Sequence, residues 1–544
     1  MKWDSNSTFF TFPFDVRITC TIFTALKCDI WRLFPLDEEL IDMIYADLLS
    51  PNPTAEARGN SLINWKMIFR LLGGLLLFEA ILFVVCSVVS LCYGESDFLV
   101  FLKVAATNLL VGGALQAIFH KADRHLTRRD AYCIVTFSWI LFCLSGMMPF
   151  LLSGSIQHVV DAFFETVSGF TTTGASILND IESLSHGMLF WRSLTQWVGG
   201  VGIVFFTIAI FPFFGGESLQ LFSAESTGVK KERILPKISV TVKWIAMVYL
   251  LLSATEALLL RWGGMDWFDA INHALTSTAT GGYSTKQDSI AYWDSPFIQY
   301  VVAIFVMLSG VNFSLYCLCL RGRVKRLFED DELRFYVRTI AVITLVITLS
   351  LICFNHYGIE EAFRNAFFQV TSIITTTGFI TDDYLMWPSF TWMLLLFAML
   401  AGGCTGSTSG GLKNMRLLIL MRSIKMEFRR KLHPNAVLPV KADGRVLSTT
   451  VVSSVTTFVL FYVLCILIGW TLLLTMGLGM TEAMSTAISA LSNVGPAFGT
   501  YGPMFTWASM PDAAKWLLSF LMLIGRLELF CVLLILNPDF WKRQ

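Results

Sequence analysis

The stretch SGFTTTGASIL, residues 168–178, decides how this chain is interpreted. It follows the short apolar stretch VVDAFFETV (159–167) and places three threonines and a glycine in a row at 171–174. A polar backbone interrupted by glycine is costly in lipid, because no water satisfies its N–H and C=O groups. The stretch therefore lies outside a membrane or lines a polar space within one.

The composition is that of a polytopic membrane protein. Of the 544 residues, 55% are hydrophobic and 15% are charged, and the mean hydropathy is +0.64. Soluble domains carry roughly 25% charged residues. The formal net charge is +0, so bulk electrostatics give no reason to expect a nucleic acid as partner. Residues 1–61 are more polar and form an N-terminal extension to which we assign no role.

Ten apolar segments are each near the roughly 20 residues needed to cross a bilayer. They are 65–92, 98–120, 131–154, 188–212, 238–260, 296–320, 336–354, 388–422, 450–476 and 511–536. Four shorter apolar stretches lie between them, each about half a membrane long. These are 158–169, 267–277, 361–372 and 481–491.

Basic residues indicate the orientation of these spans. They follow the second, fourth and sixth spans, fill the segment 413–445 after the eighth, and end the chain at Lys542 and Arg543. If the spans alternate, all these residues lie on one side, which the positive-inside rule makes cytoplasmic. The four half-length stretches then all lie on the outer side.

The outer segments form an internal repeat. They read FTTTGAS (170–176), STATGGYS (277–284), IITTTGF (373–379) and LSNVGPAFG (491–499). We align Gly174, Gly281, Gly378 and Gly495, which recur roughly every hundred residues. Four units of span, half-helix, glycine-ended strand and span can surround one axis, whereas one unit alone leaves its polar backbone unsatisfied. The sequence thus predicts an all-α membrane protein with four membrane-pore-membrane repeats around one pseudo-fourfold pore.

Rows of backbone carbonyls suit a potassium ion. A cation crosses lipid only if oxygens replace its water shell, and carbonyl rings do so without burying a carboxylate. Glycine permits the backbone conformations that turn carbonyls inward. Each half-helix would also direct the negative end of its dipole at the cation. One TTTG is more often an ordinary outer loop, but four recurrences between apolar spans favour an ion filter.

The same residues resemble a known family. The four outer segments, with GGVGIVFFTIAIFP (199–212), GGCTGSTSGGLKNMR (402–416) and MLIGRLELF (522–530), are similar to the potassium-uptake proteins of the Trk/Ktr/HKT superfamily, most closely the bacterial TrkH branch. The resemblance implies two additional helices before the four repeats. The boundaries would then be 62–130 for these helices and 131–229, 230–325, 326–445 and 446–544 for repeats A to D.

The resemblance also implies which carbonyls contact the transported potassium ion. They are those of Thr172, Thr173 and Gly174; Ala279, Thr280 and Gly281; Thr376, Thr377 and Gly378; and Asn493, Val494 and Gly495. In this family, a glycine at the last position of all four units goes with potassium preference. The fourth strand, SNVG, departs most from the other three, so we expect the ring to be less symmetric there.

The eighth apolar segment is too rich in glycine for a continuous helix. Residues 402–411 contain five glycines, each costing about 1 kcal/mol relative to alanine, and four hydroxyl residues that compete for backbone partners. We predict that the span breaks here and that the loop obstructs the pathway below the filter, where the family has its gate. The predicted gate residues are Gly402, Gly403, Thr405, Gly406, Ser407, Gly410, Gly411, Lys413 and Arg526.

Arg526 lies inside the tenth span, where a charge usually faces a pore or a partner. Two interpretations are open: a pore-lining cation beside the gate loop, or an arginine bonded to nearby carbonyls or to Glu528. We predict that His273 packs in its half-helix rather than binding metal. Close helix packing is the prediction for the glycines at 199–202 and for Gly310 with Asn312.

No motif for catalysis or nucleotide hydrolysis is present in the sequence, so we do not predict an enzyme. The resemblance implies a homodimer in the lipid of the bacterial cytoplasmic membrane, controlled by a cytosolic nucleotide-binding subunit. A sodium-permeable or ion-coupled member of the superfamily remains an alternative. A membrane enzyme or receptor is another, and it would place converging ionisable residues inside the spans.

Overall fold

The computed structural model describes residues 63–123, 126–210, 238–320, 322–436 and 438–542. The N-terminal extension and the basic residues at 230–237 lie outside them. The described chain is helical apart from one hairpin of two-residue strands, β1 (Lys441–Ala442) and β2 (Arg445–Val446). The predicted all-α class is therefore confirmed.

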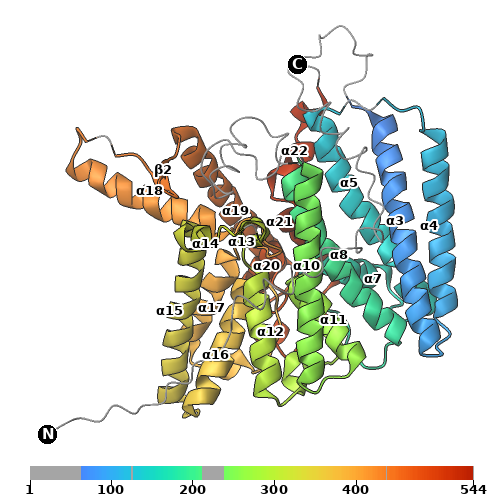
Figure 1. Cartoon of the computed structure of the whole chain (residues 1–544), viewed down its shortest axis with the longest axis horizontal. Coiled ribbons are helices and arrows are strands. Elements are labelled where there is room, and N and C mark those ends of the chain that lie inside the picture. Colours follow the sequence, from blue (N-terminus) through green and yellow to red (C-terminus); the bar gives the residue numbers. More distant parts are fainter. Residues whose placement is uncertain (1–62, 124–125, 211–237, 321, 437, 543–544) are drawn as a thin grey trace.

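Two long antiparallel helices come first and lie side by side at one edge of the molecule (Figure 1). They are α3 (Trp65–Cys92) and α4 (Phe98–Ile118). The turn between them is bonded to the next part of the chain, because Glu95 Oε1 accepts hydrogen bonds from His186 N at 2.9 Å and His186 Nδ1 at 2.8 Å. Partial burial alone would raise the pKa of Glu95, but these hydrogen bonds hold it below its ordinary value.

Each remaining quarter of the chain holds a long helix, a half-length helix and a second long or broken helix. The first has α5 (Arg128–Gly146), α6 (Met148–Ser153), α7 (Val159–Phe170) and α8 (His186–Ile210). The second has α10 (Ile238–Trp262), α11 (Trp267–Thr278), η4 (Ser289–Tyr292), α12 (Pro296–Ser309) and α13 (Phe313–Leu320). The third has α14 (Lys325–Glu329), α15 (Asp331–Phe354), α16 (Ile359–Ile374), η5 (Tyr384–Met386), α17 (Ser389–Ala401) and α18 (Asn414–Leu432). The fourth has α19 (Thr449–Thr475), α20 (Met480–Ser492), η6 (Gly499–Tyr501), α21 (Asp512–Arg526), α22 (Phe530–Leu536) and η7 (Pro538–Trp541).

The four half-length helices are α7, α11, α16 and α20, and they agree with the predicted stretches to within a few residues. Their last turns are buried in the centre of the molecule. Such short helices form at membrane depth because the surrounding long helices, rather than lipid, cover them.

Six described helices are long and apolar enough to cross a membrane, or eight when each strongly bent pair counts as one span. The chain is thus a multi-pass membrane protein. Two of the ten predicted spans, the sixth and the tenth, are bent in a way that was not predicted: α12 and α13 meet at 92°, and α21 and α22 at 118°. The eighth span breaks after Ala401, as predicted, and helix resumes at Asn414. A run of apolar residues indicates that a segment is buried in protein or lipid, but it does not show whether the helix is straight. Composition alone therefore did not predict either bend.

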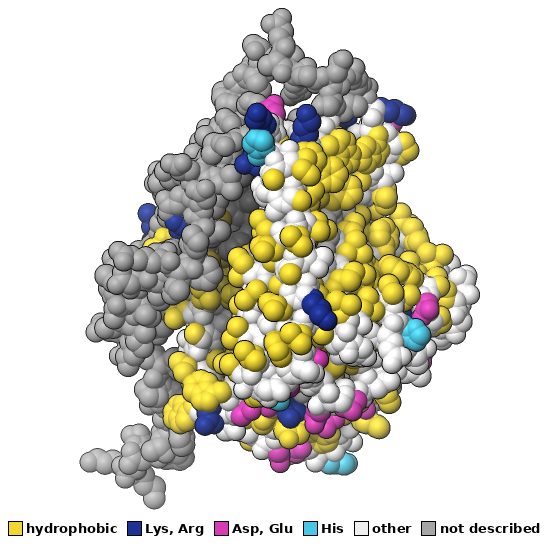
Figure 2. All heavy atoms as spheres, turned by 90° about the vertical axis from the view of Figure 1, so that its right-hand side faces the viewer, with side chains coloured by type: hydrophobic (Ala, Val, Ile, Leu, Met, Phe, Trp, Pro, Cys, Tyr) yellow, Lys and Arg dark blue, Asp and Glu magenta, His cyan; other side chains and the backbone are white. Residues whose placement is uncertain are grey.

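One side of the molecule carries a broad hydrophobic band between two polar ends (Figure 2). Lys and Arg gather at its upper end and most Asp and Glu at its lower end. Helix α18 and the C-terminus lie at the upper end (Figure 1), which the positive-inside rule makes cytoplasmic.

The contact between α3 and α4 offers a test of this packing. A Cβ on Gly112 would lie 2.7 Å from the Gly73 carbonyl oxygen, whereas nothing lies within 4 Å of a Cβ on Gly113. We expect Gly112→Ala to destabilise the protein by about 1–3 kcal/mol through overpacking. Gly113→Ala should be neutral or slightly stabilising, because alanine favours helix. Thermal unfolding in detergent measures both, and equal effects of the two variants would contradict the packing.

Candidate functional site: a ring of four strands and the loop beneath it

The irregular segments after the four half-length helices, called strands below because they run along the ring, share one backbone conformation. In each, a residue in the left-handed region is followed two residues later by a glycine with positive φ. The first positions are Thr172 (φ +53°), Thr280 (+52°), Thr376 (+58°) and Asn493 (+57°). The glycines are Gly174 (+80°), Gly282 (+83°), Gly378 (+86°) and Gly495 (+99°), called the ring glycines below.

The hydrogen bonds at the helix ends repeat as well. In every unit the residue before the ring glycine donates its N–H to a carbonyl in the last helical turn. The pairs are Thr173 to Ser168 (2.9 Å), Gly281 to Thr276 (2.8 Å), Thr377 to Ser372 (2.8 Å) and Val494 to Ser489 (2.9 Å). This bond satisfies a terminal carbonyl and turns the chain out of the helix. The internal repeat is therefore a repeat of structure.

The four ring glycines surround a common centre. A Cβ on any of them would collide with a carbonyl oxygen of the next unit: Gly174 with Gly281, Gly282 with Thr377, Gly378 with Val494, and Gly495 with Thr173. These contacts close a cycle through all four units in chain order. Glycine is needed here both for its positive φ and for the close approach of the neighbouring backbone.

The second unit has a different register from the one that the sequence alignment assumed. Gly281 was aligned with Gly174, but Gly282 has the positive φ and the contact with the next unit. The residues equivalent to 172–174 are Thr280, Gly281 and Gly282, so Ala279 corresponds to Thr171. Two adjacent glycines fit the alignment equally well in sequence, but only Gly282 packs against a carbonyl oxygen of the next unit, that of Thr377.

A cavity opens on the side of the ring that faces the predicted exterior. All four ring glycines line it, and Arg192, Lys286 and Trp507 are among the other lining residues. The strands around it are bonded across every junction between units. The bonds are Tyr283 Oη to Glu165 O (2.7 Å), Ala291 N to Ile380 O (3.0 Å), Tyr384 Oη to Ala497 O (2.8 Å) and Trp507 N to Ser176 O (2.9 Å).

Side chains from the helices hold the strands from behind. His273 is buried, with Nδ1 2.7 Å from Asp269 O and Nε2 2.9 Å from Ser284 Oγ, which agrees with the predicted packing role. Gln196, which sequence reasoning missed, donates from Nε2 to Gly281 O at 2.7 Å and accepts from Tyr283 N at 3.0 Å. An amide on a membrane helix has no sequence signal that separates it from ordinary packing.

The predicted close packing of the glycines at 199–202 holds for two of the three. A Cβ on Gly199 would collide with Phe170 O, and one on Gly200 would lie 2.9 Å from Ala279 Cα. Nothing lies within 4 Å of a Cβ on Gly202.

The glycine-rich loop between α17 and α18 lies against the inner side of the strands. Thr408 Oγ1 donates to Thr278 O at 3.2 Å and to Ser309 O at 3.3 Å. Gly410 N donates to Thr376 Oγ1 at 2.7 Å. The loop therefore contacts strand ends of the second and third units directly.

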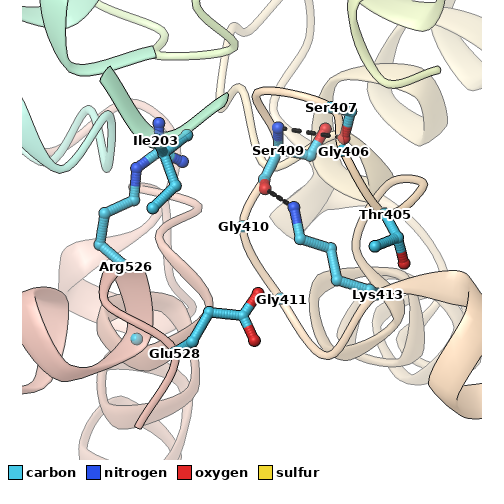
Figure 3. Close-up of a pocket in the computed structure, with 11 residues that line it drawn as sticks. Ile203, Thr405, Gly406, Ser407, Ser409, Gly410, Gly411, Lys413, Arg526 and Glu528 are labelled. Carbon is cyan, nitrogen blue, oxygen red and sulfur yellow. Dashed lines mark hydrogen bonds between the residues drawn. The ribbon is translucent and has the colours of Figure 1, made fainter. Parts of the chain in front are cut away.

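Seven of the nine predicted gate residues line one cavity on this inner side (Figure 3). They are Thr405, Gly406, Ser407, Gly410, Gly411, Lys413 and Arg526. Gly402 and Gly403 instead close the base of the loop, where Gly402 O accepts from Asn414 Nδ2 at 2.6 Å and Gly403 O from Asn414 N at 3.0 Å.

Buried groups on neighbouring helices hold the loop in place. Glu332 Oε1 on α15 accepts from Thr405 N at 2.7 Å and from Met415 N at 3.0 Å, and so ties both ends of the loop to one carboxylate. Sequence reasoning missed Glu332, because it lies at the start of a span among other acids.

The bend between α12 and α13 also bonds to the loop. Gly310 O accepts from Cys404 N at 2.8 Å, and Phe313 N donates to Gly406 O at 3.1 Å. The prediction that Gly310 and Asn312 serve only helix packing was therefore incomplete, since they mark a break whose free backbone groups pair with the loop.

Arg526 bonds to the loop and not to Glu528. Its Nη1 donates to Thr408 O at 2.7 Å and its Nη2 to Gly199 O at 3.2 Å. Glu528 pairs with Arg416 instead. Figure 3 shows Arg526 and Lys413 approaching the loop from opposite sides, and Lys413 Nζ donates to Ser409 O. This geometry meets both interpretations, because Arg526 lies beside the loop and also bonds to two carbonyls, though not to Glu528.

Comparison with known proteins places this arrangement in a family. The sequence profile of TrkH, described as a cation transport protein, matches residues 98–542. The chain belongs to the TrkH family. The Trk system potassium uptake protein TrkH of Escherichia coli K12 is 37% identical over 484 residues, covering 88% of this chain and 100% of the relative. TrkG of the same organism is 32% identical, covering 84% and 94%.

A solved TrkH structure has the same fold. The crystal structure of the potassium transporter TrkH from Vibrio parahaemolyticus matches with a TM-score of 0.80 at 33% identity, covering 88% of this chain and 100% of that chain. The all-helical architecture is therefore that of the TrkH family.

The register of the second strand can be tested directly. We expect Gly282→Ala to lower cation uptake by about tenfold or more, because it strains a left-handed residue and collides with Thr377 O. Gly281→Ala should have a smaller effect, since its Cβ meets only the movable Gln196 side chain. Ion uptake by the purified variants in liposomes makes the comparison. A larger loss of uptake in Gly281→Ala than in Gly282→Ala would instead support the alignment of Gly281 with Gly174.

Proposed function

We propose that the protein mediates potassium uptake across the bacterial cytoplasmic membrane through a filter of backbone carbonyls. The ring in which each glycine abuts the carbonyl of the next unit is the observation that carries the proposal. Four membrane-pore-membrane repeats, with the two helices α3 and α4 outside them, account for this ring. The names of the TrkH and TrkG relatives, potassium uptake proteins, support potassium as the ion.

The proposed ion-contacting carbonyls follow from the register of the ring. They belong to Thr172, Thr173 and Gly174; Thr280, Gly281 and Gly282; Thr376, Thr377 and Gly378; and Asn493, Val494 and Gly495. Ala279 lies one position further in, as Thr171 does. The half-helices end just before these residues, so their dipoles add negative potential where the cation loses water.

The ring is not chemically uniform. Threonine precedes the ring glycine in the first and third units, whereas Gly281 and Val494 do so in the second and fourth. The Gly281 carbonyl also accepts a hydrogen bond from Gln196 at 2.7 Å. An ion would share that oxygen with an amide donor, which weakens its interaction with the cation on one side of the ring.

The loop at 402–411 is proposed as the gate below this filter. It touches strand ends and fills the space in which Arg526 places a positive charge that opposes a passing cation. Conduction then requires the loop to move away from Thr376, Thr278 and Arg526. The membrane potential drives inward movement, worth about 2.3 kcal/mol per charge per 100 mV.

The partners are proposed from resemblance. A second copy of the chain would form a homodimer in the lipid, and a cytosolic nucleotide-binding subunit would control the gate. The basic helix α18 and the hairpin at 441–446 lie at the cytoplasmic end (Figure 1). Helix α18 follows the gate loop directly in sequence. A partner bound at this end can therefore act on the loop through α18.

Transport by intact cells tests the proposed ion. Expression in a bacterial host lacking its own potassium uptake should restore growth at low external potassium. Excess sodium should compete weakly, because carbonyl rings of this kind favour the larger ion. Growth that depends on sodium, or uptake of sodium at the rate of potassium, would contradict a potassium filter. Gly282→Ala, which should take up potassium about tenfold more slowly, is the negative control at matched expression.

Removal of the loop's contacts tests the gate. Deleting residues 407–409 should raise basal potassium flux, and Arg526→Ala should raise it by about tenfold, since a hydrogen bond from a charged donor is worth about 1.5–3 kcal/mol. Lys325→Ala removes an exposed positive charge at the same end of the protein and is the matched control. Flux measurements in liposomes, scaled to folded protein, decide the outcome. Unchanged flux in both loop variants would argue against a gate here.

A further inference from the structure

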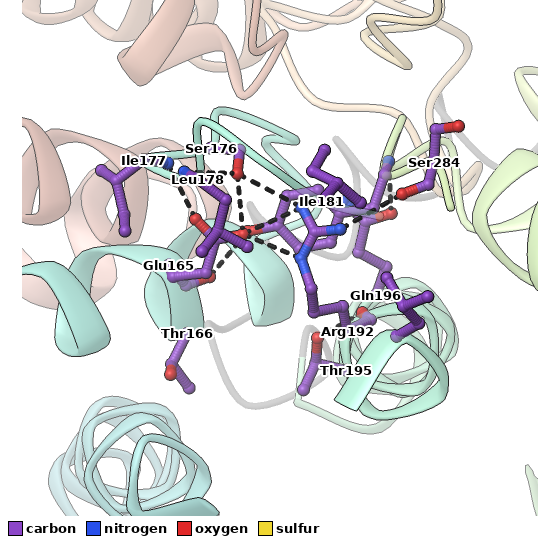
Figure 4. Close-up of polar contacts among 12 residues, drawn as sticks. Glu165, Thr166, Ser176, Ile177, Leu178, Ile181, Arg192, Thr195, Gln196 and Ser284 are labelled. Atoms are coloured by element: carbon purple, nitrogen blue, oxygen red, sulfur yellow. Dashed lines mark hydrogen bonds and ion pairs between the residues drawn. The ribbon is translucent and has the colours of Figure 1, made fainter. Parts of the chain in front are cut away.

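One buried pair of charges lies beside the proposed filter without belonging to the ring or to the gate loop. Glu165 on α7 and Arg192 on α8 form an ion pair of 3.0 Å, with side chains only 0% and 1% exposed (Figure 4). Burying two charges is costly unless both are well bonded. Their partners therefore indicate what the pair does.

Glu165 holds the strand of its own unit. Its Oε1 accepts from Ser176 Oγ at 3.0 Å, and its Oε2 accepts from Ile177 N at 3.0 Å. These two residues follow the ring glycine Gly174 directly on the outer side. The carboxylate thus fixes where the first strand leaves the ring.

Arg192 joins this strand to the next unit. Its Nη1 donates to Ser284 O at 3.2 Å and its Nη2 to Ser176 Oγ at 3.3 Å. The guanidinium also lies 4.1 Å from the centre of the Tyr283 ring. Figure 4 shows the guanidinium between Ser176 and Ser284. Each serine comes two residues after the ring glycine of its unit, so one side chain bridges equivalent positions of two adjacent strands.

The four units differ at this position. Counting back nine residues from each ring glycine gives Glu165, His273, Gln369 and Thr486. His273 bonds Ser284 in the second unit just as Glu165 bonds Ser176 in the first. Of these four positions, only the first holds a carboxyl group, and only there does Arg192 form an ion pair with it.

The charges also matter electrostatically. Arg192 lines the outer cavity together with the four ring glycines. An unpaired positive charge on Arg192 would repel an arriving cation, because the side chain is buried and solvent screens its charge only weakly. Glu165 cancels that charge while leaving the arginine free to bridge the strands.

We propose that the Glu165–Arg192 pair is a specificity-determining clamp, which sets the spacing of the first two strands and cancels the charge of Arg192 at the outer mouth of the filter. Both are positioning residues, since they act through the strands. The inference rests on the proposed potassium filter.

Transport by charge-altering variants in liposomes separates the two proposed effects of the pair, which are the balance of charge and the spacing of the strands. In Glu165→Gln the unpaired Arg192 should raise the KM for potassium by roughly tenfold. In Arg192→Gln the unpaired carboxylate should leave KM unchanged or lower it, while discrimination against sodium falls. The double variant should return KM to near the original value without restoring discrimination. Arg192→Lys keeps the positive charge but loses the planar guanidinium that bonds to both strands. It should therefore discriminate less against sodium at a nearly normal KM for potassium.

Glu360→Gln is the matched control, because Glu360 pairs with Arg364 on the same side but is 60% exposed. It should change neither quantity. Equal KM in Glu165→Gln, Arg192→Gln and the original protein, with unchanged discrimination, would overturn the clamp. So would a uniform loss of maximal rate and thermal stability in both variants without a higher KM in Glu165→Gln, since that marks a purely structural pair. Failure of the original protein to take up potassium would instead refute the proposed function.

Discussion

The structure depends on one constraint, that backbone N–H and C=O groups at membrane depth need partners other than lipid. Strands that expose carbonyls toward an axis cannot exist alone in a bilayer. Here each strand is completed by the next, because every ring glycine packs against a carbonyl of the following unit. Closure of this cycle requires four units, which explains why the chain repeats the same helix, turn and strand four times.

The same constraint explains the broken helices. Helices break after Gly310, within 402–413 and at 527–529. Each break leaves backbone groups inside the protein without a partner in their own helix. The break in the sixth span pairs with the loop through Gly310 O and Phe313 N, and Glu332 takes N–H groups from both ends of that loop. Breaks in neighbouring helices thus satisfy one another, so a loop can persist where lipid would forbid it.

Local composition made part of this structure predictable. The half-length helices, the positive-φ glycines of three units and the break at 402–411 all follow from residue types that act on their own backbone. The register at Gly281 and Gly282 could not be predicted, because both residues permit the turn and only the neighbouring unit selects one. Glu332, Gln196 and the Glu165–Arg192 pair were missed for the same reason, since each acts on a strand or loop that is distant in sequence.

Carrying four units on one chain also allows them to differ, and the glycine-rich loop at 402–411 is one such difference. The loop comes from the third unit, bonds to the second at Gly310, and meets Arg526 of the fourth, which in turn bonds to Gly199 of the first. Four identical subunits would present four such loops to one axis, where there is room for the backbone of one. A single asymmetric loop is instead bonded to the second, third and fourth units, and through Arg526 it is linked to the first. If this loop is the proposed gate, a change in any of these units can act on it.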